Sequence, residues 1–93
     1  MNVSPEAVPV MPRGVRLHFD RVRDGWVLLA PERAVRLDPI GHAILSEVDG
    51  TKPFSEIVGT LAARYAAPEA EISGDCDAFL SGLVERRFLD LGP

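Results

Sequence analysis

The chain has too little cysteine for a disulfide framework and too little histidine for a structural zinc site. Cys76 is the single cysteine among 93 residues, so no intramolecular disulfide can form. One cysteine would need several histidine partners to hold zinc, and the sequence has only His18 and His42, far apart in the chain. We therefore expect no metal site, and a lone thiol favours a reducing compartment.

Long apolar runs are missing as well. No stretch approaches the roughly 18 residues that a membrane span requires. Residues 1–12 contain three prolines and no lysine or arginine, so they lack the basic and apolar regions of a signal peptide. We expect a cytoplasmic protein that does not enter a membrane, with residues 1–12 as a flexible N-terminal arm.

The length allows one small domain, which we place over residues 13–91. With 46% hydrophobic and 26% charged residues, the composition is near that of globular proteins and argues against a disordered one. A domain of this size has little interior for a deep catalytic cavity. The sequence also lacks Ser/His/Asp, P-loop and G-x-G-x-x-G arrangements, so we expect neither an enzyme nor a bound cofactor.

Charge is divided unevenly between the two halves. Residues 1–37 carry six arginines against four acids, whereas residues 38–93 carry four basic residues against ten acids. Because nucleic-acid affinity comes largely from neutralised phosphates, an acidic second half argues against a DNA or RNA partner.

The first half of the domain has the pattern of a small antiparallel sheet. Val15, Leu17 and Phe19 alternate with polar residues, which predicts a strand over residues 15–21. Asp24-Gly25 is a hairpin signal that leads into a second strand over 26–30. Pro31 then breaks the chain before a short third strand over 33–37, which suits the edge of the sheet.

The second half has the period of helices. Asp38 and Pro39 match an N-cap and a first helical position, so a helix is expected over 39–48. Apolar residues at helical spacing predict a second helix over 54–66 and a third that opens at Pro68, with Gly74 as a point where a kink or a late start is allowed. The fold class expected is therefore α+β: a three-stranded antiparallel sheet followed by three helices, winged-helix-like.

An unpaired edge strand at 33–37 can accept an extended peptide as an extra strand. Ala78 and Gly82 would leave a shallow trough on the third helix, and Arg33, Arg36 and Arg86 could attract acidic side chains. The alternative is a winged-helix DNA-binding regulator, although the acids of the third helix oppose it. Peptide capture and DNA binding both remain open at this point.

Several segments, in their order and spacing, resemble the PqqD family of pyrroloquinoline quinone biosynthesis. The resemblance covers about residues 12–91. It is carried by Pro12 to Leu17, Val27 to Glu32, Leu37 to Leu45, Val48 to Gly50, Ile57, Val58, Leu61, Tyr65 and Asp77 to Leu80. Pro53 departs from the pattern, because such sequences often have Ser or Thr there to cap the second helix.

The resemblance implies a peptide chaperone without catalysis, a precursor-peptide recognition element. In this family such a protein binds the precursor peptide PqqA and presents it to the radical S-adenosylmethionine enzyme PqqE. The peptide is held as an added strand between the third strand and the third helix. By position this groove comprises Arg33, Ala34, Val35, Arg36, Leu37, Asp75, Ala78, Phe79, Gly82, Leu83 and Arg86. We expect a monomer in working complexes, with an unpaired edge that can mediate weak dimers at high concentration.

Overall fold

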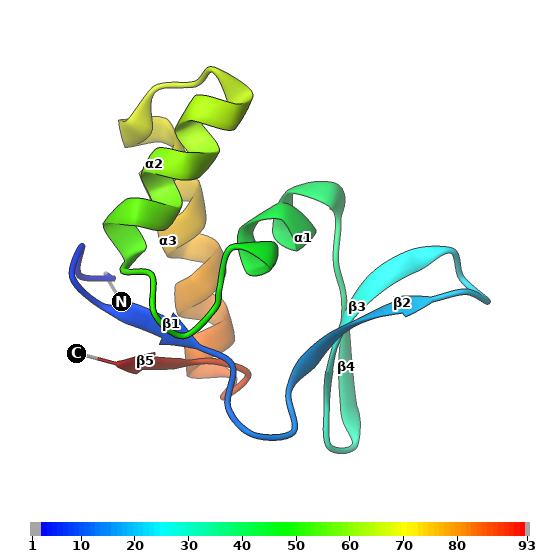
Figure 1. The fold of residues 1–93 in the computed structure, drawn as a ribbon. Helices are drawn as coiled ribbons and strands as arrows, with labels where there is room; N and C mark the ends of the chain where they lie inside the picture. The colour runs from blue at the N-terminus through cyan, green and yellow to red at the C-terminus, as the bar shows by residue number, and fades with distance from the viewer. Residues whose placement is uncertain (1–2, 93) are drawn as a thin grey trace.

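The computed structural model describes residues 3–92, which form two antiparallel sheets and three helices (Figure 1). The predicted α+β class is confirmed: a three-stranded sheet is followed by three helices. No helix within the described residues is long and apolar enough to cross a membrane. The elements are β1 (Val8–Val10), β2 (Arg16–Asp20), β3 (Gly25–Ala30), β4 (Arg33–Arg36), α1 (Pro39–Ser46), α2 (Phe54–Tyr65), α3 (Glu69–Glu85) and β5 (Asp90–Gly92).

The three-stranded sheet consists of two successive hairpins, with β3 between β2 and β4. Leu17, Leu28 and Val35 lie opposite one another across the three strands and belong to the core cluster or pack against it. The hairpin expected at Asp24-Gly25 is present, and Asp24 has a φ of 54°, a left-handed conformation that aspartate tolerates better than most residues. The alternating pattern of the sequence therefore gives the sheet its buried face.

A second, two-stranded sheet joins the beginning and the end of the described chain. β1 pairs antiparallel with β5, so that Val8 lies opposite Gly92 and Val10 opposite Asp90. The structure differs here from the expected loose arm over residues 1–12, because a sheet edge tolerates proline and Pro9 is fully buried in it. Residues 1 and 2 of that arm lie outside the described residues. The packed unit thus begins earlier than residue 13.

The same N-terminal segment caps α2. Pro53 precedes this helix and forms no side-chain cap. The N–H of Phe54 donates instead to the carbonyl of Ala7 at 2.8 Å, and the N–H of Ser55 donates to the carbonyl of Pro5 at 3.0 Å. Because the first N–H groups of a helix have no partner within it, these two carbonyls replace the missing side-chain cap.

The other helices follow the sequence closely. Asp38 caps α1 as predicted, since its carboxylate accepts a hydrogen bond of 2.7 Å from the N–H of Gly41. The first helix ends at Ser46, earlier than the expected residue 48, and the second ends at Tyr65 rather than at residue 66. The third helix runs through Gly74 without interruption. A late start, which the glycine would allow, does not occur.

The hydrophobic core lies where the three helices meet the sheets. In Figure 1, α2 and α3 lie side by side, and α1 lies between this pair and the three-stranded sheet. Two residues of the predicted helical stripes are not buried, because Ile40 is 53% exposed and Tyr65 is 47% exposed. The largest fully buried side chains include Leu28, Leu45, Ile57, Leu61, Leu80, Phe88 and Leu89.

Candidate functional site

The fourth strand forms an edge of its sheet and has β3 as its partner. The N–H of Leu37 donates to the carbonyl of Trp26 at 3.0 Å, so the backbone faces β3 at this position. Backbone direction alternates along an antiparallel strand, so Val35 also faces β3, whereas Ala34 and Arg36 face away from the sheet. The outer edge of β4 therefore directs the N–H and C=O groups of Ala34 and Arg36 toward any added strand.

The third helix contributes a face with small residues. Asp75, Ala78, Gly82 and Arg86 recur every three or four positions, so they share one side of the helix. Ala78 is exposed and Gly82 is half-buried. A Cβ atom placed on Gly82 would meet no other atom within 4 Å. The space beside this glycine is therefore open.

Two of the predicted groove residues pack inward. Leu83 is only 3% exposed and belongs to the core, so it supports the helix from beneath. Phe79 is half-buried and lies against α1, where a Cβ on Gly41 would come within 3.1 Å of its ring. A side chain at position 41 would therefore require the Phe79 ring to shift by a few tenths of an ångström.

The fourth strand and the third helix meet at one end. Arg33, the first residue of β4, donates a hydrogen bond of 2.8 Å from Nη1 to the backbone carbonyl of Arg86, the C-cap residue of α3. Their guanidinium carbons lie 4.1 Å and 5.2 Å, respectively, from the centre of the Phe88 ring. The structure thus brings Arg33 and Arg86 together, from the two elements that were expected to form the groove.

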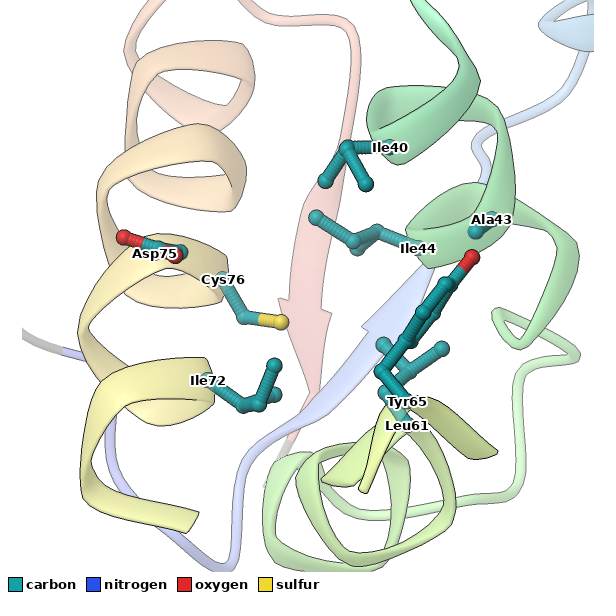
Figure 2. Close-up of a pocket in the computed structure, with 8 residues that line it drawn as sticks. All are labelled: Ile40, Ala43, Ile44, Leu61, Tyr65, Ile72, Asp75 and Cys76. Carbon is teal, nitrogen blue, oxygen red and sulfur yellow. The ribbon is translucent and has the colours of Figure 1, made fainter. Parts of the chain in front are cut away.

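Asp75 also lines a second feature, an apolar hollow of about 220 Å³ between the three helices. Figure 2 shows side chains from all three helices around a common space, with the exposed Tyr65 at one side and Asp75 on α3. The sequence pattern assigned these apolar residues to the core and did not predict a hollow. The lining consists of Ile40, Ala43, Ile44, Leu61, Tyr65, Ile72, Asp75 and Cys76.

The thiol in this hollow is unreactive. Burial raises the pKa of Cys76 to about 11, and the negative charge of Asp75 acts in the same direction. The side chain is 1% exposed, so the thiol is protonated and shielded at neutral pH. Cys76 is therefore a packing residue, as its place on the apolar stripe indicates.

An aromatic cluster lies at the other end of β4. The ring of His42 stacks on Trp26 with centroids 4.3 Å apart, and Phe19 meets Trp26 edge-on at 5.4 Å. Arg36 and Leu37 border the same concave surface, whose volume is about 360 Å³. Because Trp26 is the single tryptophan of the chain, its fluorescence reports on this end of β4.

The charge of α3 does not suit a helix that reads DNA. Five acidic residues and no lysine or arginine lie between Glu69 and Glu85. Phosphate groups would meet repulsion along this helix, and the electrostatic term that supplies most nucleic-acid affinity would be lost. The charge of α3 therefore argues against a nucleic-acid duplex as the ligand of this helix.

Comparison with known proteins gives a consistent family. The family model described as coenzyme PQQ synthesis protein D (PqqD) matches residues 25–89. A relative from Rhodopseudomonas palustris (strain HaA2), named PqqA binding protein, is 42% identical over 89 residues, which cover 96% of this chain and 87% of the relative.

Solved structures agree with the sequence comparison. The solution NMR structure of the PqqD truncation of Methylobacterium extorquens PqqCD, described as a functional and stand-alone RiPP recognition element, is 45% identical with a TM-score of 0.81. The match covers 95% of this chain and 94% of that one. The crystal structure of PqqD from Xanthomonas campestris is 42% identical with a TM-score of 0.60, over 95% of this chain and 98% of that one.

Proposed function

The chain belongs to the PqqD family, and on this premise we propose that it is a peptide chaperone of pyrroloquinoline quinone biosynthesis. It binds the precursor peptide PqqA and presents it to the radical S-adenosylmethionine enzyme PqqE. The relative named PqqA binding protein supports the identity of the peptide. Delivery requires that capture be reversible, so the affinity for the free peptide is moderate.

The peptide lies as an added strand along the outer edge of β4 and is covered by α3. The observation that carries this proposal is the outward backbone of Ala34 and Arg36, next to a helix face with open space at Gly82. The groove consists of residues 33–37 with Asp75, Ala78, Phe79, Gly82 and Arg86, while the buried Leu83 supports it from below.

The apolar hollow between the helices extends the groove. Asp75 lies both on the α3 face of the groove and at the hollow, so a peptide that passes this residue reaches the exposed side chains of Ile40 and Tyr65. An apolar side chain of the peptide buried there gains about 25 cal/mol per Å² of covered apolar surface. The hollow therefore suits an apolar anchor beside the added strand.

The chain acts by binding rather than by catalysis. Its one thiol is buried with a raised pKa, and the His42 ring stacks on Trp26. Both groups thus have packing roles that do not involve a reacting substrate. We place this step in the cytoplasm, where precursor peptides are made on ribosomes and where an unpaired cysteine stays reduced.

The test is a proline at the outward-facing position of β4. Ala34→Pro removes the N–H that an added strand needs, while the ladder between β4 and β3 stays intact because proline is tolerated where the N–H faces outward. We expect the affinity for PqqA to fall at least about tenfold. A titration monitored by Trp26 fluorescence or by calorimetry measures this affinity. Ala34→Ser keeps the N–H and should bind like the wild type.

Two results would argue against this function. Equal PqqA affinity of Ala34→Pro and Ala34→Ser, with unchanged circular dichroism, would show that β4 does not receive the peptide. Salt-dependent binding of mixed-sequence duplex DNA by the wild-type chain would support the regulator alternative instead.

A further inference from the structure

Arg33 and Arg86 form a pair of cations that no carboxylate of the described chain neutralises. The ion pairs within residues 3–92 both belong to Glu47, whose partners are Lys52 and Arg64. Arg33 and Arg86 are instead directed to one aromatic ring and to a backbone carbonyl. Two like charges held near each other therefore lack a counter-charge from the described part of the protein.

Both side chains are held in position before any ligand arrives. Phe88, whose ring centre lies 4.1 Å and 5.2 Å from the two guanidinium carbons, is 1% exposed and anchored in the core. The hydrogen bond to the Arg86 carbonyl restrains Arg33 further. A guanidinium offers a planar fork of donors that matches a carboxylate, and a restrained fork loses less entropy on binding than a free one.

The pair lies at one end of the groove. Arg33 begins β4 and Arg86 ends α3, so both walls contribute one cation at the same end. On α3, Asp75 lies three turns of helix away from Arg86 and brings an exposed acid to the opposite end. The α3 side of the groove therefore has an arginine at one end and an acid at the other.

We propose that the Arg33–Arg86 pair binds an acidic side chain of the captured peptide and thereby fixes the direction in which the peptide lies. This inference rests on the proposed function, because it concerns one subsite of the same groove. The acidic residue of the peptide lies at the end of the groove near Phe88, and a basic residue of the peptide lies at the other end, where it faces Asp75. A peptide placed in reverse would leave the two arginines without a partner and bring like charges together.

The experiment is a double-mutant cycle measured by calorimetry at physiological salt. Arg33→Gln and Arg86→Gln are each titrated with PqqA and with peptides in which one acidic residue at a time is changed to its amide. We expect each protein variant to bind PqqA about fivefold more weakly. At one acidic position of the peptide, the change in binding free energy caused by the peptide substitution and that caused by the protein substitution should not be additive. This position identifies the acidic residue that contacts the arginine pair.

Control variants separate this subsite from general charge effects and from misfolding. Arg16→Gln removes the same charge from β2, at the other edge of the sheet, and should leave the affinity within about twofold of wild type. Arg33→Lys keeps the charge without the planar fork and should recover part of the loss. PqqA with an amidated C-terminus should bind unchanged, since the ligand is a side-chain carboxylate.

The outcomes distinguish this inference from the proposed function. Wild-type affinity of Arg33→Gln and Arg86→Gln for every peptide would overturn the carboxylate subsite and leave peptide capture standing. Loss of affinity on C-terminal amidation of PqqA would overturn the assignment of the ligand as a side-chain carboxylate. Binding of duplex DNA to wild type but not to Arg33→Gln would show that the arginine pair binds a phosphate rather than the peptide. Absence of PqqA binding by the wild type would overturn both proposals.

Discussion

The N–H of Phe54 lies 2.8 Å from the carbonyl oxygen of Ala7, and this hydrogen bond joins the first segment of the chain to the start of α2. The neighbouring bond from Ser55 to Pro5 has the same effect. Val3 adds a third connection, since its N–H donates to the carboxylate of Asp77 at 3.1 Å and its side chain is 5% exposed. The N-terminal segment is thus part of the folded unit rather than an appendage.

Deletion of residues 1–7 should destabilise the protein. The deletion removes both backbone acceptors at the start of α2 and the buried side chain of Val3. Loss of a helix cap and of a buried valine predicts a decrease of about 3 kcal/mol in the free energy of unfolding. Urea denaturation, monitored by circular dichroism, measures this decrease in the free energy of unfolding.

Ser4→Ala is the control for that deletion. It changes an exposed side chain, leaves the capping carbonyls in place and should alter the free energy of unfolding by less than about 0.5 kcal/mol. An unchanged urea midpoint after the deletion would contradict the capping role of the segment.

Glu47 should make stability depend on pH. Its carboxylate accepts hydrogen bonds from Lys52 at 2.9 Å and from Arg64 at 2.8 Å, and these bonds lower its pKa below the ordinary value of 4.5. A lowered pKa in the folded state adds stability above pH 4.5, and this stability is lost as the pH falls further. Glu47→Gln should therefore cost about 1 kcal/mol at pH 7 and progressively less at acid pH.

Urea titrations at several pH values between about 3 and 7 check this dependence. Glu32→Gln changes an exposed acid in the turn between β3 and β4, serves as the control and should leave the urea midpoint at pH 7 close to that of wild type. A difference in the free energy of unfolding between wild type and Glu47→Gln that stays constant across this pH range would contradict the proposed role of the ionised Glu47 carboxylate.

Gly82→Leu should block the peptide without harming the fold. A side chain at this position enters open space beside α3, and leucine is about 1 kcal/mol better than glycine inside a helix. We expect a melting temperature at or above that of wild type and a PqqA affinity at least about tenfold lower. Differential scanning calorimetry and peptide titration give the two values.

Gly59→Leu provides the comparison, because a Cβ atom placed on Gly59 would also meet no other atom within 4 Å, whereas this glycine lies on α2. It should raise stability similarly and leave PqqA binding intact. Equal affinity of both variants for PqqA would place the peptide elsewhere.

Local sequence patterns predicted the elements of the main domain well. Alternation around Leu17 and the cap at Asp38 depend on neighbouring residues, so they can be recognised without knowledge of the fold. The sheet of β1 and β5 could not be found this way. Each strand has three residues, one contains Pro9, and the partners are at opposite ends of the chain.

Some features of the candidate site could likewise be predicted from local sequence, and others depend on the folded chain. Periodicity placed Ile40 and Tyr65 on apolar stripes, but it does not distinguish a buried position from the wall of a hollow, which depends on how helices cross. The contact of Arg33 with Arg86 links residues distant in the sequence and requires the folded chain. Small residues such as Gly82 were the one local signal of an open helix face.

The most direct test of peptide capture is an amide-resolved NMR titration of the ¹⁵N-labelled protein with PqqA at physiological salt. We predict shifts concentrated in residues 33–37 and along the α3 face from Asp75 to Arg86, with the N–H groups of Ala34 and Arg36 among the most affected. Unchanged spectra at saturating peptide, or shifts confined to the β2 edge and the β1–β5 sheet, would contradict the account.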